Sequence, residues 1–397
     1  MVAGLPVMGY NFSAVDKLVT DSLASFGDSV VVLIKQDENI LHHNNKGNLD
    51  STSKIGIASA SKWISGAVIL RLAEKNLLKL DDSIGTYLPI FTQNGKGHIT
   101  IRQCFSMTSG LYGGKNFEIN PHMTLKRSVD SIATNTPMAF PAGTQFAYTG
   151  SGIQAVGRIA EVVTGKSWAL VAREELLDPC GMTNTTYDDF GLNPAIAGGI
   201  RSTAQDDLRF LTMVMGNGFY RGTRVLTPAS IGEMFKNQTK NTPIYYSPFP
   251  AELSGYPDGK TPRYAFGCWT MFTNAQTGLE DEIASPGYFG SYPWADRCRN
   301  IYGIVLVYNP KEGRRSHFAS FMLTDLVRKE IGGCMVSGIE RKAGIMPARG
   351  VGSSRFHYSD RLTRVINGRF WESPKGPSTG PAPRPSFTSF FYNNPGY

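Results

Sequence analysis

Ser59-Ala60-Ser61-Lys62, together with the apolar run at residues 63–78, is the most informative stretch of this 397-residue chain. In a helix, side chains three residues apart share one face, so the amine of Lys62 is expected beside the hydroxyl of Ser59. A serine hydroxyl is a weak nucleophile at neutral pH, and a partly desolvated lysine can accept its proton as attack begins. The first turn of a helix also favours developing negative charge. The stretch therefore predicts a helix that presents a nucleophilic serine and its base.

The pattern Ser-x-x-Lys is short, and it occurs twice in this sequence. The other copy, Ser51-Thr52-Ser53-Lys54, lies in a polar segment without an amphipathic run behind it, and is interpreted as a loop or the entry to a strand. Behind Ser59, apolar residues recur at nearly helical spacing: Ile64, Ala67, Val68, Leu72 and Leu77. This spacing predicts a core-facing helix whose N-terminus opens into a cleft, with a helix cap as the alternative role for Ser59.

Strand-like segments lie at both ends of the chain. Two of them, residues 30–34 and 40–41, flank a polar turn, and three more lie at residues 264–269, 289–294 and 301–307. The pattern between the two groups is mostly helical, and a closing helix follows the last strand. We therefore predict an α+β fold in which terminal strands form one sheet layer and the helical middle is an insertion, with the site in the cleft between them.

The same pattern divides the chain into three parts. A discontinuous sheet domain is predicted for residues 1–78 and 255–345, and a helical domain for residues 79–254. Residues 346–397 form a Pro-rich basic tail that ends in several aromatic residues. We expect these aromatic residues to pack along the body or on a neighbouring subunit, which makes the tail a candidate surface for homo-oligomer formation.

The net charge of +8 is concentrated near the C-terminus. From residue 341 onward there are nine Lys and Arg residues against Asp360 and Glu372, so the remainder is nearly neutral. A body without a broad basic face is not expected to bind nucleic acid. No run approaches the roughly 18 apolar residues that span a bilayer, and no basic residue precedes the short apolar start, so neither a membrane anchor nor a signal peptide is expected.

The five cysteines are far apart and odd in number: Cys104, Cys180, Cys268, Cys298 and Cys334. They form no Cys-x-x-Cys pair and have no histidine at metal-ligand spacing, so we expect free buried thiols and a reducing cytoplasmic location, with one disulfide as the alternative. The six histidines also lack ligand spacing. The sequence therefore predicts neither a metal nor an organic cofactor.

A second candidate element is the glycine-rich turn Phe146-Ala147-Tyr148-Thr149-Gly150-Ser151-Gly152, which directly precedes a helical pattern. A tyrosine at such a turn can direct its hydroxyl into a cleft. The alternative is a packed ring with a satisfied hydroxyl, which is the common state of a buried tyrosine.

Six segments carry a family resemblance when they are taken in order. They are Ile57-Ala58-Ser59-Ala60-Ser61-Lys62, Met107-Thr108-Ser109-Gly110-Leu111, Tyr148-Thr149-Gly150, Pro179-Cys180-Gly181-Met182, Ala197-Gly198-Gly199-Ile200-Arg201-Ser202-Thr203-Ala204, and Ser285-Pro286-Gly287-Tyr288-Phe289-Gly290-Ser291-Tyr292-Pro293-Trp294. Over roughly residues 10–335, this set resembles the serine β-lactamase-like and penicillin-binding family, especially its class C type and the related family VIII carboxylesterases. The joint match is far more specific than any one motif.

The resemblance implies a β-lactamase/transpeptidase-like fold, with an antiparallel sheet flanked by helices and an inserted helical lobe. It makes Ser59 the acyl-accepting nucleophile, Lys62 the amine that lowers its proton affinity, and Tyr148 the partner that passes the proton to the leaving group. The oxyanion would be bound by the backbone N–H groups of Ser59 and Tyr288. Tyr288 directly follows the third motif, which is expected at a sheet-edge strand.

Two departures from the family's pattern bear on the substrate. The second motif usually reads Tyr-x-Asn, and Gly150 removes the amide that would bond the lysine and the substrate. The third motif usually reads Lys-Thr-Gly or His-x-Gly, and Ser285-Pro286-Gly287 takes its place. The usual cation holds the carboxylate of penicillins and peptide C-termini, so its loss should weaken such substrates more than neutral esters.

These residues favour a serine carboxylesterase that acts through an acyl-enzyme on small, short-acyl esters. Ser285 and Gly287 are the candidate substrate-binding residues beside Tyr288. Three more aromatic residues are candidates for lining the pocket, with core packing as the alternative for each: Tyr112, Phe289 and Trp294. Two other functions stay open. One keeps the nucleophile for a β-lactamase, a peptidase-like amidase or an acyltransferase; the other is a catalytically silent binding scaffold.

Overall fold

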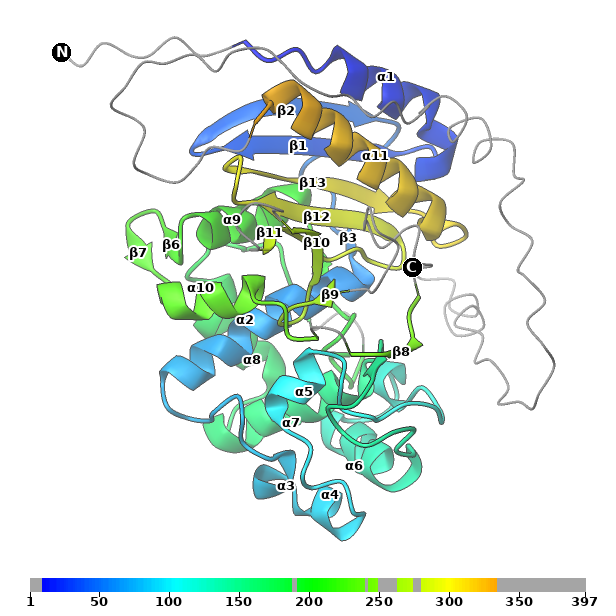
Figure 1. The fold of residues 1–397 in the computed structure, drawn as a ribbon, viewed down its shortest axis with the longest axis vertical. Helices are drawn as coiled ribbons and strands as arrows, with labels where there is room; N and C mark the ends of the chain where they lie inside the picture. The colour runs from blue at the N-terminus through cyan, green and yellow to red at the C-terminus, as the bar shows by residue number, and fades with distance from the viewer. Residues whose placement is uncertain (1–8, 188–190, 240–241, 249–262, 274–279, 334–397) are drawn as a thin grey trace. The chain divides into compact units, whose positions relative to one another are not determined.

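A seven-stranded antiparallel sheet forms one layer of the protein, with strand order β2-β1-β13-β12-β11-β10-β9 (Figure 1). The computed structural model describes residues 9–187, 191–239, 242–248, 263–273 and 280–333. The strands are β1 (Val30–Gln36), β2 (Asn39–Lys46), β9 (Arg263–Tyr264), β10 (Trp269–Thr273), β11 (Glu280–Ala284), β12 (Gly290–Asp296) and β13 (Ile301–Tyr308). The predicted α+β fold with an antiparallel sheet is confirmed.

The sheet joins the two ends of the described chain. Strand β1 pairs with β2 across a tight turn in which Asp37 has φ +52°, and on its other side it pairs with β13. In that second pairing Val31 lies opposite Leu306. Strand β1 is apolar and buried along nearly its whole length, as expected for a strand covered on both faces. Strand β1 therefore pairs with a strand that lies about 270 residues later in the chain.

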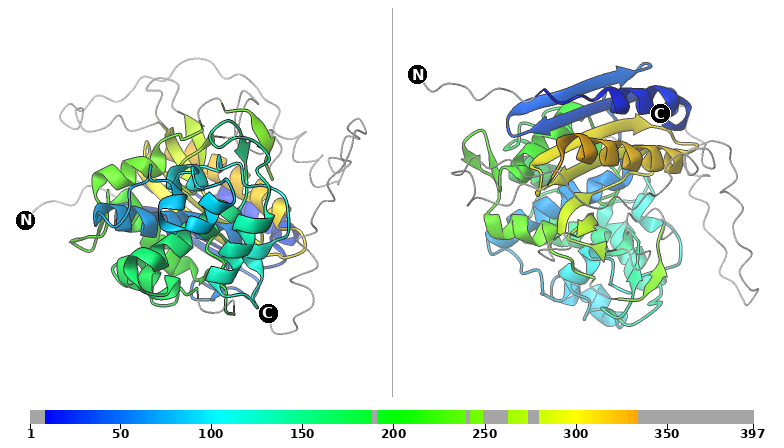
Figure 2. Two further views of the ribbon diagram at one scale, coloured as in Figure 1. Left: turned by 90° about the horizontal axis from the view of Figure 1, so that it is seen from below. Right: turned by 45° about the horizontal axis from the view of Figure 1, so that its top comes forward.

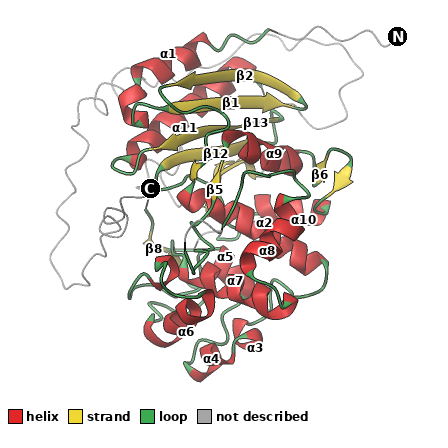
Figure 3. Ribbon diagram, turned by 180° about the vertical axis from the view of Figure 1, so that it is seen from behind, coloured by secondary structure: helices red, strands yellow, loops and turns green. Residues whose placement is uncertain are grey.

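Helices cover both faces of the sheet. Helices α1 (Ser13–Asp21) and α11 (Gly313–Ile331) lie on one face, and α9 (Ala204–Met215) lies on the other, as the front and back views show (Figures 1 and 3). The tilted view shows α11 lying across the central strands (Figure 2). Helix α9 begins after Thr203, whose side chain accepts a hydrogen bond from the N–H of Asp206.

The remaining helices form a lobe below the sheet in Figure 1, and the left view of Figure 2 looks onto this lobe. Its elements are α3 (Ile84–Tyr87), α4 (Pro89–Gln93), α5 (Ile101–Phe105), η3 (Phe117–Ile119), α6 (Leu125–Asn135), α7 (Ser151–Thr164), α8 (Trp168–Ala172), η4 (Arg173–Leu177) and α10 (Pro228–Phe235). Thr100 caps α5 in a capping box with Gln103, and Gly165 ends α7 in a left-handed conformation.

Helix α2 (Ser61–Glu74) is the central helix of the molecule. It contacts α7, α8 and α10, and eleven of its side chains, from Ser61 to Leu72, are buried. A helix buried on all sides needs no polar face. The 3-10 turn η2 (Ala58–Ala60) precedes it and contacts β12, so the start of α2 lies against the sheet.

Short pairings attach the loops to this frame. Strand β3 (Ile55–Gly56) pairs with β5 (Arg201–Ser202), β4 (Phe146–Ala147) pairs in parallel with β8 (Ile244–Tyr246), and β6 (Phe219–Tyr220) forms a hairpin with β7 (Thr223–Arg224). The first two pairings hold the segments just before Ser59 and Tyr148.

Three expectations need correction or lie beyond the described residues. The strand predicted at residues 264–269 is a hairpin, because Gly267, with φ +85°, turns the chain between β9 and β10. Three cysteines are free and buried, but Cys298 is disulfide-bonded, so the expectation of free thiols is wrong there. The tail at residues 346–397 lies outside the described residues, and its role in self-association stays a prediction, as do the domain boundaries.

No helix in the described part of the chain is long and apolar enough to cross a membrane.

Candidate active site

Ser59 and Lys62 meet at the start of the central helix. The Nζ of Lys62 donates hydrogen bonds to the Oγ of Ser59 at 2.9 Å and to the carbonyl oxygen of Ala197 at 2.8 Å. Ser59 lies in η2 and is half-buried, so its hydroxyl is partly accessible. Ala58, just before it, has φ +46°, a conformation that alanine rarely adopts. The chain therefore makes a sharp, strained turn at the predicted nucleophile.

Burial makes Lys62 a base near neutral pH. Its side chain is almost entirely removed from solvent, with a relative exposure of 4%. This desolvation lowers the pKa of Lys62 to about 7, although the nearby carboxylate of Glu118 acts in the opposite direction. A substantial fraction of Lys62 is therefore neutral at physiological pH and can accept the proton of Ser59.

Tyr148 completes the group from the turn after β4. Its N–H donates to the carbonyl oxygen of Tyr246 at 3.1 Å, and its ring stacks on Trp269 with the centroids 5.3 Å apart. The Nζ of Lys62 lies 4.8 Å from the centre of the Tyr148 ring. Burial raises the pKa of Tyr148 to about 12, so the phenol is protonated at neutral pH. The structure thus brings all three predicted catalytic side chains together.

The third predicted segment lies against the nucleophile. The Oγ of Ser285 donates to the carbonyl oxygen of Ser59 at 3.2 Å. A Cβ atom at Gly287 would be 2.0 Å from the carbonyl oxygen of Ile57, so only glycine fits this approach. Tyr288 follows in a turn and is half-buried. The Ser285-Pro286-Gly287 segment therefore lies beside Ser59. The expectation of a sheet-edge strand is wrong, because the segment connects β11 to β12, which are both interior strands of the sheet.

The predicted pocket aromatics divide into two groups. Tyr112 is half-buried and contacts the exposed rings of Tyr245 and Tyr246, with centroids 5.5 and 5.0 Å away. Phe289 is buried against Tyr308, at 5.1 Å between centroids, and Trp294 is fully buried within β12. Phe289 and Trp294 are therefore packed in the core, which is the alternative stated for both of them.

Several residues of the site were missed in the sequence. His317 on α11 donates from Nε2 to the carbonyl oxygen of Gly287 at 2.5 Å. Ala197 supplies its main-chain oxygen to Lys62, Glu118 adds a charge, and Tyr246 lies beside Tyr148. None of these residues lies at a regular spacing from Ser59 that would have identified it. The only indication in the sequence was Gly150, which lacks the side-chain amide of the usual motif, so another residue was needed to take the place of that amide.

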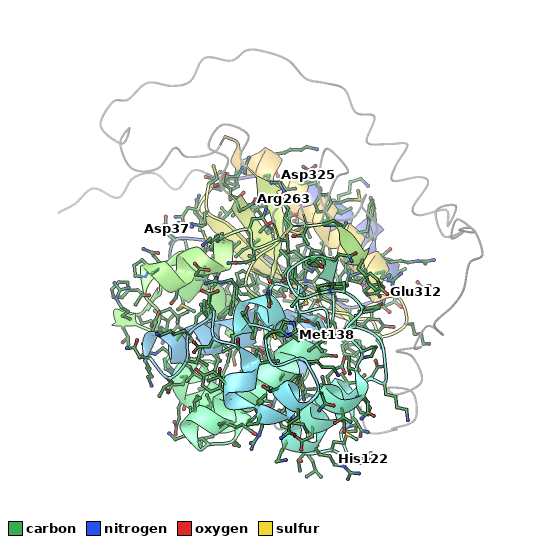
Figure 4. All side chains as sticks on the ribbon, turned by 60° about the horizontal axis from the view of Figure 1, so that its bottom comes forward. Asp37, His122, Met138, Arg263, Glu312 and Asp325 are labelled. Carbon is green, nitrogen blue, oxygen red and sulfur yellow. The ribbon has the colours of Figure 1, made fainter. Side chains whose placement is uncertain are left out.

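Figure 4 shows the molecule with its side chains, viewed from the side of the helical lobe. His122 marks the outer edge of that lobe, Arg263 marks β9, and Glu312 and Asp325 mark α11. The other copy of Ser-x-x-Lys, residues 51–54, lies in the turn between β2 and β3, as interpreted from its polar surroundings. Within the described ranges, no three His, Cys, Asp or Glu side chains gather as a metal site.

Comparison with known proteins agrees with this arrangement. The Beta-lactamase family model matches residues 15–321. Penicillin-binding protein 4 of Amycolatopsis lactamdurans is 26% identical over 228 residues, which are 49% of this chain and 60% of that protein. The match therefore spans less than two thirds of that relative's length.

Two solved structures extend the comparison. A putative beta-lactamase from Bacteroides dorei DSM 17855 aligns with a TM-score of 0.73 and 28% identity, over 81% of this chain and 99% of that one. A family VIII carboxylesterase aligns with a TM-score of 0.58 over 79% and 97% of the two chains, and at 16% identity this likeness is one of fold alone. The family match over most of the chain confirms the resemblance, and the protein belongs to the Beta-lactamase family.

Proposed function

We propose that this protein is a serine carboxylesterase that hydrolyses small, short-acyl esters through an acyl-enzyme. The observation that carries the proposal is the contact between a buried Lys62, whose pKa is lowered to about 7, and the hydroxyl of Ser59, 2.9 Å from its Nζ. A base of this strength, in direct contact with a hydroxyl, is what nucleophilic attack by serine requires at neutral pH.

The reaction begins as Ser59 attacks the ester carbonyl and its proton moves to Lys62. The Tyr148 phenol, which is protonated at neutral pH, then gives a proton to the departing alcohol and is recharged from Lys62. Water attacks the acyl-enzyme by the same route and releases the acid. The backbone N–H groups of Ser59 and Tyr288 are proposed to bind the oxyanion, since Gly287 brings this turn against the backbone of residues 57–60.

Two features of the site favour neutral esters over β-lactams and peptides. The third motif offers Ser285 in place of a cation, and the Ser285 hydroxyl is already bonded to the main chain of Ser59. Gly150 offers no amide to the substrate. A carboxylate-bearing substrate would therefore lose both usual anchors, whereas an ester needs neither.

The aromatic cluster of Tyr112, Tyr245 and Tyr246 favours an ester substrate whose acyl or alcohol group is apolar. Tyr246 is the last residue of β8 and lies opposite Ala147, the residue before Tyr148. Its phenol acts electrostatically on Tyr148. Aromatic side chains beside the proton-transfer group offer apolar surface without a formal charge.

Hydrolysis of p-nitrophenyl butyrate tests the proposal. The wild-type protein is expected to give a burst of one p-nitrophenolate per active site and an acyl group on Ser59 by mass spectrometry. Ser59→Ala should abolish both. Ser51→Ala is the matched control, because it alters the other Ser-x-x-Lys copy and should leave the rate unchanged. An unchanged rate in Ser59→Ala would refute the proposal.

The alternative with the same nucleophile is hydrolysis of a β-lactam or amide, or acyl transfer. It is favoured by the similarity to Penicillin-binding protein 4 of Amycolatopsis lactamdurans. Turnover of a cephalosporin and of the butyrate ester under the same conditions separates the two, since the alternative requires the higher kcat/KM for the cephalosporin. Failure of a fluorophosphonate to label Ser59 would support the silent scaffold.

A further inference from the structure

The side chain of Glu118 lies against Gly150, which stands where the related second motif carries asparagine. A Cβ atom at residue 150 would be 3.2 Å from the Cγ of Glu118, 3.6 Å from its Oε1 and 3.2 Å from the Cβ of Ala197. Contacts of 3.2 Å are tighter than almost all real Cβ contacts, so a side chain at residue 150 would force its neighbours to move. The space that an asparagine would need is therefore occupied by Glu118.

A buried polar network holds the Glu118 segment in this position. The Nδ2 of Asn193 donates to the carbonyl oxygens of Phe117, Glu118 and Asn120 at 3.2 to 3.3 Å. The Oδ1 of Asn193 accepts from the Nε2 of Gln154 at 2.6 Å, and both side chains are fully buried. Gln154 lies on α7, four residues after Gly150. The helix that carries the altered motif thus also fixes the segment that fills the vacated space.

The same network reaches Lys62. The Oε1 of Gln154 accepts from the N–H of Ile196 at 3.0 Å, and the carbonyl oxygen of the following residue, Ala197, accepts from the Nζ of Lys62 at 2.8 Å. One short loop, residues 193–197, therefore contacts both the main chain of Glu118 and the amine of Lys62.

Glu118 and Lys62 act on each other through their charges. Burial raises the pKa of Glu118 and Lys62 opposes this, while burial lowers the pKa of Lys62 and Glu118 opposes that. The other neighbours of the Nζ of Lys62 are the Ser59 hydroxyl, the Tyr148 ring and the Ala197 carbonyl, so Glu118 is the described charge that faces it. The Oε2 of Glu118 is buried and has no hydrogen-bond partner in the described part of the chain.

We propose that Glu118 is a positioning residue that replaces the asparagine of the usual second motif and stabilises Lys62 in its charged form during catalysis. The proposal rests on the proposed function for the roles of Ser59 and Lys62. Glu118 would act on Lys62 as the carboxylate of a catalytic triad acts on its base, by stabilising the protonated form.

The proton balance defines the step at which Glu118 acts. As the bond between the Oγ of Ser59 and the carbonyl carbon forms, the hydroxyl proton passes to Lys62 and the carbonyl electron pair moves to oxygen. Lys62 is then a buried ammonium, and the carboxylate of Glu118 offsets this charge. When the bond to the leaving oxygen breaks, that oxygen takes the proton by way of Tyr148 and Lys62 becomes neutral again. Glu118 itself neither gives nor takes a proton.

The test measures the rate at which a fluorophosphonate phosphonylates Ser59 between pH 5 and 9. Fluoride leaves without protonation, so the rate reports the transfer from Ser59 to Lys62 and needs no knowledge of the natural ester. In Glu118→Gln the carboxylate no longer raises the pKa of Lys62. The acid limb of the pH–rate profile, where the rate falls as Lys62 becomes protonated, should therefore move to lower pH by about one unit or more. The plateau rate should fall by about tenfold, because the ammonium is no longer stabilised.

Asp130→Asn is the matched control. Asp130 is an acid on α6 in the same lobe and pairs with the exposed Lys126. Its removal should change neither the limb nor the plateau. If Glu118 only supported the fold, its substitution would lower the plateau and leave the limb in place, and that result would overturn the proposal.

A pair of variants tests the exchange between Glu118 and an asparagine at residue 150. Gly150→Asn alone should slow phosphonylation at least tenfold, since the new side chain meets Glu118. The double variant Glu118→Ala, Gly150→Asn has room for the amide and should be faster than either single variant. A double variant no faster than Glu118→Ala would contradict the replacement.

The outcomes separate this inference from the proposed esterase activity. If the acid limb of Glu118→Gln is not shifted while Ser59 is labelled and the butyrate ester is hydrolysed, Glu118 does not have the proposed role but the esterase activity stands. A shifted limb without ester turnover keeps Glu118 and removes the esterase. Absence of labelling at Ser59 removes both.

Discussion

The Nζ of Lys62 donates a 2.9 Å hydrogen bond to the Oγ of Ser59 from a position that is 4% exposed. The contact joins residues one helical turn apart, while the burial that makes Lys62 a usable base comes from segments far away in the chain. The reactivity of Ser59 therefore depends on how completely the surrounding structure keeps water from Lys62.

The pH dependence of acylation follows from this burial. Neutral Lys62 is the active form, so kcat/KM for an ester should rise with pH and reach half its plateau at about 7. Lys62→Arg keeps the charge but cannot accept a proton, and should lower kcat/KM by about a thousandfold or more. Lys54→Arg, in the other Ser-x-x-Lys copy, should have no effect. Full activity of Lys62→Arg would exclude Lys62 as the base.

Tyr148→Phe removes the phenol while the ring can still stack on Trp269. We expect kcat/KM, which reports acylation, to fall by about a hundredfold to ten-thousandfold for ethyl butyrate, because the leaving group loses its proton donor. The loss should be smaller for p-nitrophenyl butyrate than for ethyl butyrate, since p-nitrophenolate leaves without a proton. Steady-state kinetics with the two esters measure this, and equal losses for both would argue against a proton-donor role.

Gly287→Ala should disturb both stability and activity. The new Cβ would be 2.0 Å from the carbonyl oxygen of Ile57, and a backbone atom cannot move aside cheaply. We expect a loss of about 1–3 kcal/mol in the free energy of unfolding, together with slower acylation of Ser59. Gly232→Ala on α10 is the control, because its Cβ meets nothing within 4 Å and alanine should stabilise the helix by up to about 1 kcal/mol. Urea denaturation compares the two variants.

His317 should make the fold sensitive to acid. Burial lowers its pKa from 6.5 to about 4, with the charge of Arg314 acting in the same direction and the hydrogen bond to Gly287 against it. Between these values the unfolded chain binds a proton that the folded chain does not, so the free energy of unfolding falls as pH falls from about 6.5 to about 4. Above that range the contribution is constant.

His317→Gln tests this, because its amide can donate to Gly287 without titrating. Urea midpoints at pH 7.5 and pH 5 should differ less in His317→Gln than in the wild-type protein. His122→Gln, at an exposed position in the helical lobe, should retain the wild-type difference. Equal pH sensitivity of the urea midpoint in all three proteins would show that His317 does not cause the sensitivity to acid.

Local signals explain the parts of the fold that could be predicted. The caps at Thr100, Gly165 and Thr203 depend on a few neighbouring residues, and the structure has helix ends at all three. The apolar runs of β1 and β13 likewise identify buried strands. Such signals are short in range, so they are visible without knowledge of the tertiary contacts.

The environment of the site could be predicted only in part. An aromatic run such as that around Phe289 and Trp294 indicates burial, but not whether a ring faces the core or the substrate. Glu118 and His317 have no regular spacing from Ser59, so no periodicity relates them to it. Their roles depend on which loop packs beside α2 and which face of α11 meets Gly287.

The sequence alone determined the reactive pair, because Ser59 and Lys62 are one helical turn apart and any helix there brings them together. It also determined the order of motifs that identifies the family. Only the tertiary structure decided the chemistry of that pair. The desolvation of Lys62, its neighbouring charge and the approach of Tyr148 come from segments distant in the chain, and burial exists only once those segments are packed around α2.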